Sequence, residues 1–262
     1  MASEELLITR FGAVAVVTLN RPAKRNALTA QLLATLDESI CELDDDHAVR
    51  AIVLTGADPA FSAGIDLRSL GTQLANTRAL ARSDGHPRRG LLPWHKTPII
   101  GAINGPAVTG GLELALGCDF LVASERASFA DTHARVGVMP GGGMTIRLPQ
   151  LVGIDRARYM SLTGNFVDAA TANDWGLVIE VTPHGELLNR AIEIATSIAS
   201  LDPEPVSRLR DMYDQVGDLS GQAAWLSERK SYGEWMSQKF DSAAVASRVD
   251  SVMQRGSREA GL

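Results

Sequence analysis

The chain has 262 residues, enough for one sizeable α/β core with a smaller appendage. Its 45% hydrophobic and 21% charged residues are ordinary globular usage, which excludes an intrinsically disordered, fibrous or disulfide-scaffold protein. A net charge of −6 at pH 7 argues against nucleic acid and anionic membrane surfaces as partners, because both bind clustered cations.

Cysteine usage and the start of the chain predict the compartment. The only two cysteines, Cys41 and Cys118, each lie in an apolar stretch with a helical pattern, so we expect buried thiols in a reducing compartment. The opening segment MASEELLITRFGAVAVVTLN lacks the basic flank and long apolar run of a signal peptide. No run of about eighteen apolar residues occurs anywhere, and we expect a cytoplasmic protein without membrane contact.

The first half of the chain alternates strand and helix patterns. Thr29 is a plausible N-cap for a helix that continues to about Asp44, and a short helix is expected over Gly110–Gly117. We expect the polar stretch Ser69–Gly90 to be mobile, because it has no firm periodicity. Strands are expected over Leu6–Arg10, Val14–Asn20, Ala51–Thr55, Ile99–Ile103 and Phe120–Ala123. This alternation favours an α/β fold with crossover connections.

The second half of the chain is mostly helical. The prolines of the Asp202–Pro205 segment suit a helix start, and we place the domain boundary there, with a core over 1–201 and a helical region over 202–262. Helices are expected over Ile154–Thr163, Asp168–Trp175, Glu186–Ala199, Pro203–Val216, Gly221–Met236 and Ser242–Arg255.

Two segments rich in small residues predict a place where a ligand can approach the main chain. In FSAGIDL, a strand gives way to Ser62, Ala63 and Gly64 before the acidic Asp66. In GPAVTGGLELA, glycines stand where a helix would begin, and there the backbone N–H groups lack partners within the helix. Each segment alone could be a tight turn, but together they suggest paired amides directed at a negatively charged group.

These segments resemble the signature stretches of the enoyl-CoA hydratase/isomerase (crotonase) superfamily. FSAGIDL, GPAVTGGLELALGCD and FADTHARVGVMPGGG occur in the family's order and spacing, NRPAKRNAL near the start is also similar, and the likeness covers about Leu6 to Leu201. The resemblance implies an α/β spiral of ββα units with a helical C-terminal region, assembled as trimers or hexamers. It also implies an acyl-CoA substrate whose CoA is not a separate cofactor, and a role in fatty-acid metabolism.

The resemblance also assigns roles to individual residues. Ala63 and Gly110 match the two positions whose backbone N–H groups hold the thioester oxygen, and Glu113 matches one of two family glutamates. The second glutamate position falls at His133, which departs from the family pattern. A histidine can donate or accept a proton near pH 7, so Glu113 and His133 could still form an acid–base pair. Alternatively, Glu113 complements a helix dipole and His133 is part of the pocket wall.

The remaining family positions predict how the acyl-CoA is bound. Lys24 and Arg25 could meet its phosphates, or could be solvated surface cations, and the glycines after Pro140 could widen the acyl pocket or simply form a turn. Substrate-binding positions carried over from the family are Lys24, Arg25, Ala27, Ser62, Ala63, Ile65, Asp66, Leu67, Gly110, Gly111, Pro140 and Gly141. The other histidines have no metal-ligand spacing, so no metal site is expected.

The reaction expected from this reading is the hydration of a 2-enoyl-CoA to a 3-hydroxyacyl-CoA. The departure at His133 leaves two alternatives open: a different enolate reaction such as double-bond isomerisation, or an acyl-CoA binding protein without catalysis.

Overall fold

The computed structural model describes residues 5–66, 90–217 and 221–238. By its internal contacts the chain divides into two compact units, with the boundary in the sequence between Ser207 and Arg208. The boundary expected between residues 201 and 202 stays a prediction. The candidate site lies in the first unit.

A six-stranded sheet forms the centre of the first unit, with strand order β1-β2-β3-β4-β6-β9. The first two strands form an antiparallel hairpin that turns at Gly12, whose φ of 60° favours glycine. All other neighbours in this sheet are parallel, and helices lie between several of them in sequence, as expected for the α/β class. The strands are β1 (Leu6–Phe11), β2 (Val14–Leu19), β3 (Ala51–Gly56), β4 (Ile99–Ile103), β6 (Phe120–Ser124) and β9 (Glu180–Thr182).

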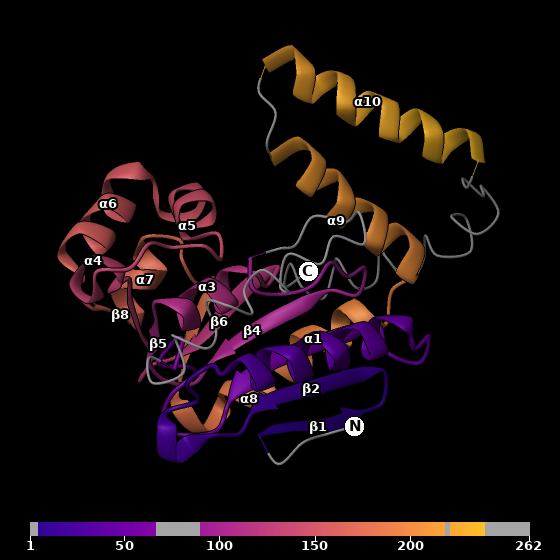
Figure 1. Ribbon diagram of the computed structural model, residues 1–262. Helices are drawn as coiled ribbons and strands as arrows, with labels where there is room; N and C mark the ends of the chain where they lie inside the picture. The colour runs from indigo at the N-terminus through magenta and orange to yellow at the C-terminus, as the bar shows by residue number, and fades with distance from the viewer. Residues whose placement is uncertain (1–4, 67–89, 218–220, 239–262) are drawn as a thin grey trace, which may run out of the picture. The chain divides into compact units, whose positions relative to one another are not determined.

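Two long helices cover opposite faces of this sheet (Figure 1). On α1 (Ala30–Asp45), buried residues at helical spacing such as Leu36 and Ile40 pack with one set of strand side chains. On α8 (Leu187–Ala199), Ala191 and Ala195 pack with the alternate set, which includes Val53. Burial on both faces explains why every residue of β3 and β4 is buried and why both strands are mostly apolar.

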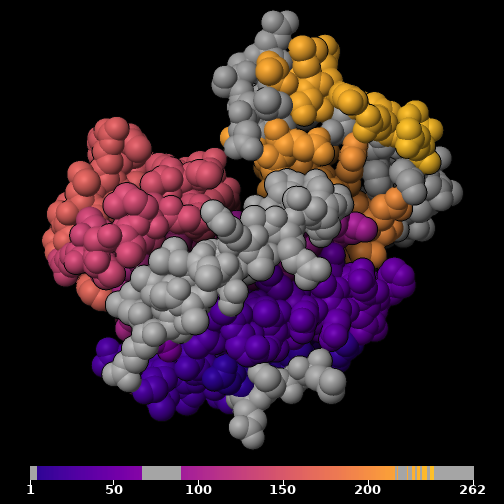
Figure 2. Space-filling model, viewed as in Figure 1, coloured from indigo at the N-terminus to yellow at the C-terminus, as the bar shows by residue number. Residues whose placement is uncertain are grey.

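A smaller lobe after β4 carries most of the candidate site. Its three-stranded sheet, in the order β5-β7-β8, comprises β5 (Ala107–Val108), β7 (Ser128–Ala130) and β8 (Val167–Asp168). Its helices are α3 (Gly110–Leu116), α4 (His133–Val136), α5 (Met144–Val152), α6 (Ile154–Thr163) and α7 (Ala169–Asp174). Figure 2 shows the atoms of α4, α5 and α6 gathered in one mass at the left of the view.

Several elements agree with the sequence and several differ. The Thr29 side chain caps α1 by accepting a hydrogen bond from Leu32 N, as predicted. The prediction that Cys41 is buried is wrong: it is exposed, because it follows Ile40 of the buried stripe and is rotated onto the outer side of α1, whereas Cys118 is buried. Helix α5, which contains Pro149, is not among the helices expected from the sequence.

Helix α9 (Pro203–Gly217) begins in the first unit and ends in the second, whose described part also contains α10 (Gly221–Gln238). The bounds of both helices lie within two residues of the predicted ones. Arg208 and Glu234 form an ion pair of 2.6 Å between these helices. The expected helix Ser242–Arg255 and nearly all of the stretch Ser69–Gly90 lie outside the described residues. Among the residues that are described, none of the helices combines the length and apolar character needed to cross a membrane.

Candidate active site

The described part of the FSAGIDL segment, residues 61–66, lies between the segment around Leu28 and the loop before α3. Ser62 N–H donates to Pro106 O at 3.1 Å, and Val108 N–H donates to Ser62 O at 2.9 Å. Three residues later Ile65 forms a parallel bridge with Leu28. These contacts hold the segment beside the loop that leads into α3.

Backbone hydrogen bonds decide which amide of this segment remains available. The Ala63 N–H donates to Arg25 O at 2.9 Å, so the expected donor role of Ala63 does not fit this geometry. The N–H groups of Gly64 and Asp66 are also used, by Ser62 Oγ at 3.2 Å and Leu28 O at 2.9 Å. Within the described residues, Ile65 N–H has no hydrogen-bond partner. The available donor is therefore two residues after the predicted one.

Gly110 supplies a second available amide beside Ile65. As the first residue of α3 it has no carbonyl one turn earlier in the helix, and its N–H has no partner among the described residues. A Cβ on Gly110 would lie 3.2 Å from Ile65 N, which shows how closely the two backbones approach. A side chain at position 110 would therefore press against the Ile65 amide.

Glu113 is buried one turn into α3 and is held by a neighbouring helix start. Its Oε1 accepts hydrogen bonds from Gly142 N at 2.7 Å and from Met144 N at 3.4 Å, where α5 begins. Burial raises the pKa of the Glu113 carboxyl, although the Gly142 hydrogen bond and the charge of His133 act in the opposite direction. A carboxyl with a raised pKa in such a place is suited to proton transfer.

His133 lies between two carboxylates. Its Nδ1 donates to Asp131 Oδ1 at 2.6 Å, and its Nε2 lies 3.8 Å from Glu113 Oε2. Burial disfavours the charged imidazole, but the Asp131 hydrogen bond and the charge of Glu113 outweigh it, so the pKa of His133 is raised. Burial likewise acts to raise the pKa of Asp131, but hydrogen bonds from His133 and Ser161 leave it below its ordinary value.

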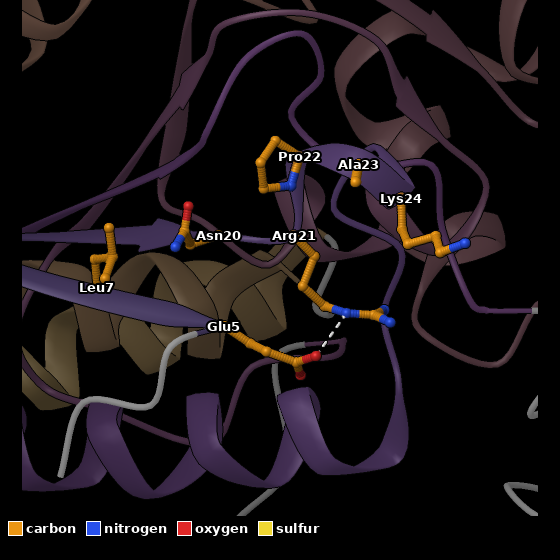
Figure 3. A pocket seen from close by; sticks show the side chains of 7 residues that line it. All are labelled: Glu5, Leu7, Asn20, Arg21, Pro22, Ala23 and Lys24. Atoms are coloured by element: carbon orange, nitrogen blue, oxygen red, sulfur yellow. Dashed lines mark ion pairs between the residues drawn. The ribbon is translucent and has the colours of Figure 1, made fainter.

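A cavity of about 650 Å³ lies beside the loop that begins at Asn20. Figure 3 shows Lys24 at this cavity, with Arg21 directed to Glu5 at 2.9 Å. Arg21 also donates to Ala27 O at 2.5 Å and lies 3.6 Å from Asp66. None of the amides or acid–base groups described above lines this cavity. The sequence reading missed Arg21, whose contacts shape this loop.

The other predicted binding residues fall into two groups. Lys24 and Arg25 are exposed, as a phosphate contact requires, and Pro140 and Gly141 precede the Gly142 that holds Glu113. In contrast, the buried Ser62 hydroxyl donates to Asn26 O at 2.8 Å and serves the loop itself. Gly111 is also buried. Leu67 lies outside the described residues.

Comparison with known proteins identifies the family. Residues 9–245 match the family model described as enoyl-CoA hydratase/isomerase. The chain belongs to this family. A relative from Rhizobium meliloti (strain 1021), named probable enoyl-CoA hydratase, is 40% identical over 205 residues, 76% of this chain and 77% of the relative.

Solved structures of the enoyl-CoA hydratase/isomerase family share the fold. The crystal structure of an enoyl-CoA hydratase from Mycobacterium smegmatis is 43% identical, with a TM-score of 0.74, over 90% of this chain and 100% of that one. A probable enoyl-CoA hydratase/isomerase from Mycobacterium abscessus is 32% identical with a TM-score of 0.83, over 96% of each chain. The predicted crotonase-like α/β fold is thus confirmed. In the described part of the chain, no group of three or more His, Cys, Asp or Glu side chains is placed to hold a metal ion.

Proposed function

We propose that the chain adds water to a 2-enoyl-CoA to give a 3-hydroxyacyl-CoA. The observation that carries the proposal is that two available backbone amides, of Ile65 and Gly110, lie close together at the start of α3. The same helix carries Glu113, which faces His133. Membership of the enoyl-CoA hydratase/isomerase family supports it.

In this mechanism the amides of Ile65 and Gly110 stabilise charge on the thioester oxygen. As water attacks the β-carbon, the electrons of the double bond move through the α-carbon onto that oxygen and form an enolate. Fixed N–H dipoles stabilise this charge without having to reorganise, which in other enzymes contributes roughly a hundred- to a thousandfold in rate per donor. The enolate then takes a proton at the α-carbon, which gives the 3-hydroxyacyl-CoA.

The facing pair of side chains moves the protons. Glu113, ionised once the pH exceeds its raised pKa, accepts a proton from the attacking water. His133, whose pKa the hydrogen bond to Asp131 helps to raise, supplies positive charge beside that carboxylate when it is protonated and can then return a proton to the α-carbon. All groups that this scheme needs belong to the chain, and the proposal requires neither a metal nor a redox cofactor.

The proposal assigns the CoA part of the substrate to the exposed cations. We assign its phosphates to Lys24 and Arg25, which are exposed on the loop whose Arg25 carbonyl accepts the Ala63 N–H. The backbone around Ala27, Ile65 and Asp66 would border the rest of the CoA group. We also propose that the chain assembles as a homotrimer or hexamer and is located in the cytoplasm. Light scattering of the purified protein tests the assembly.

The decisive experiment is an assay of the purified protein with short, medium and long 2-enoyl-CoAs, in which loss of the conjugated enoyl absorbance is followed. Hydratase activity predicts loss of absorbance and formation of 3-hydroxyacyl-CoA. Turnover only of 3-enoyl-CoAs, with gain of absorbance, would instead identify an isomerase. Tight acyl-CoA binding without turnover of either series would contradict the catalytic proposal.

A further inference from the structure

Thr109, directly before Gly110, has a backbone conformation that is rare for its residue type. Its φ is 52° and its ψ is −111°, in a region that residues with a β-carbon seldom adopt. A β-branched residue at positive φ is a genuine outlier, and such a conformation persists only where surrounding contacts impose it. Thr109 therefore needs contacts that hold it in place.

Those contacts come from the segment that carries Asp131 and His133. The Thr109 N–H donates to Ala130 O at 2.8 Å. The Thr109 hydroxyl oxygen lies 2.5 Å from the Thr132 hydroxyl and accepts a hydrogen bond from Thr132 N at 3.1 Å. Thr109 is thus tied by three contacts to two residues, Ala130 at the end of β7 and Thr132 directly before His133.

The carbonyl of Thr109 determines where the Gly110 N–H points. This carbonyl accepts the N–H of Glu113 at 2.9 Å and is therefore directed along α3. Because the peptide group is planar and trans, the Gly110 N–H of the same peptide must point the opposite way, out of the start of the helix. Rotation of this one peptide would disturb both the Gly110 donor and the backbone bond to Glu113.

We propose that Thr109 is a positioning residue of the active site. Its hydroxyl fixes the strained peptide that aims the Gly110 N–H, and it couples this donor to the Asp131–His133 segment. The inference rests on the proposed function, because it assigns a task to the oxyanion donor. It goes beyond that function by naming a side chain that acts through the direction of the Gly110 donor.

The test compares Thr109→Val with Thr109→Ser. Valine keeps the β-branched shape and the two backbone hydrogen bonds of residue 109 but removes both hydroxyl contacts. The peptide that carries the Gly110 N–H is then held less firmly, and this donor is misaligned. We expect kcat to fall at least about tenfold, which is less than the roughly hundred- to thousandfold for complete loss of one oxyanion donor because the donor is misaligned and not removed, with KM within about threefold. Serine keeps the hydroxyl, and kcat should stay within about threefold of the wild type.

A spectroscopic measurement separates positioning from a general structural role. An unreactive acyl-CoA whose conjugated acyl group carries an electron-donating amine absorbs at longer wavelength when its carbonyl is polarised. Bound to the wild type and to Thr109→Ser it should show this red shift, and bound to Thr109→Val the shift should shrink. Measurements well below the melting temperature of each variant keep folding defects out of the comparison.

Thr132→Val is the second variant, since it removes the partner hydroxyl and leaves Thr109 unchanged. It should lower kcat and the red shift in the same direction, to a smaller extent, and it decides the matter where Thr109→Val does not fold. Thr35→Val is the matched control: Thr35 lies on α1, is buried and has its hydroxyl 3.5 Å from Gln31 Nε2, away from the site. Its kcat should be unchanged.

The outcomes distinguish this inference from the proposed function. A wild type with turnover and red shift, together with valine variants that keep both, would overturn the role of Thr109 alone. A wild type with neither turnover nor red shift would remove the oxyanion site and the inference with it. Reduced kcat and reduced red shift in the valine variants, with serine normal, support the inference.

Discussion

Glu113 and His133 face each other with one oxygen and one nitrogen 3.8 Å apart, Oε2 to Nε2. The other oxygen of Glu113 is engaged by the amides of Gly142 and Met144, and the other nitrogen of His133 is engaged by Asp131. Each group is therefore oriented by one atom and presents the other to its neighbour. This division lets the carboxyl and the imidazole exchange protons with a water without losing their positions.

Replacement of Glu113 by glutamine should abolish base function while preserving the local structure. Glutamine keeps an oxygen for the Gly142 and Met144 amides but has no basic carboxylate. We expect kcat to fall at least about a hundredfold with KM within a few-fold. Steady-state kinetics on a 2-enoyl-CoA measures this, and unchanged turnover would leave Glu113 only the task of capping α5.

Replacement of Glu113 by alanine should act differently, because it also removes the acceptor at the start of α5. Loss of such a cap typically costs about 1 kcal/mol, and the cavity left by a buried side chain adds to that cost. We therefore expect Glu113→Ala to melt several degrees below Glu113→Gln, as measured by calorimetry. Equal melting temperatures would argue against the capping contact.

The pH dependence of turnover should report both members of the pair. Activity should rise as the pH passes the raised pKa of Glu113, and fall as it passes the pKa of His133, which lies above the ordinary value near 6.5. Asp131→Asn removes the carboxylate that favours the imidazolium, so the alkaline limb should move to lower pH. Because the two groups are coupled, the measured limbs belong to the pair.

The same pair predicts how stability depends on pH. The lowered pKa of Asp131 contributes stability above the ordinary value of 3.8, and this is lost as the pH falls through the folded pKa. The raised pKa of His133 contributes stability below 6.5, which is lost as the pH rises through the folded pKa. The difference in unfolding free energy between wild type and Asp131→Asn should therefore be largest between about pH 4 and 6.5. A constant difference from pH 4 to 9 would contradict the ion pair.

Periodicity in the sequence predicted most of the longer helices and strands but not the shortest ones. The stripe of α1 and the apolar run of β4 match the structure closely, because burial of a whole face leaves a pattern. The two-residue strand β5 and the four-residue helix α4 leave no such pattern. Their positions depend on pairing with β7 and on contacts with neighbouring helices.

The donor assignment shows a different limit of sequence reasoning. Motif matching found the right segment but placed the donor at Ala63, while Ile65 has the available amide. Which N–H is left over depends on the carbonyls of Arg25 and Leu28, far away in sequence. The large side chain of Ile65 does not prevent this role, since the donor is the backbone N–H.

A complex with an unreactive 3-hydroxyacyl-CoA analogue should locate the thioester oxygen. We expect this oxygen within hydrogen-bond distance, about 3 Å, of both Ile65 N and Gly110 N, with the Ala63 N–H still bound to Arg25 O. A crystal structure of the complex measures these distances. An oxygen more than about 4 Å from either amide would disprove the proposed pair.

The close approach of Gly111 to Ser62 predicts a steric requirement beneath the donor pair. A Cβ on Gly111 would lie 2.2 Å from Ser62 O, a backbone atom that cannot move without shifting the segment that carries Ile65. Gly111→Ala should therefore destabilise the fold by at least about 2 kcal/mol, the range for overpacked cores, and lower the melting temperature by at least about 4 °C. Gly185→Ala is the matched control, because nothing lies within 4 Å of a Cβ there, and its stability should change by less than about 1 kcal/mol. Calorimetry of both variants decides the question: if Gly111→Ala melts with the control, the two backbones are not held together as tightly as this structure has them.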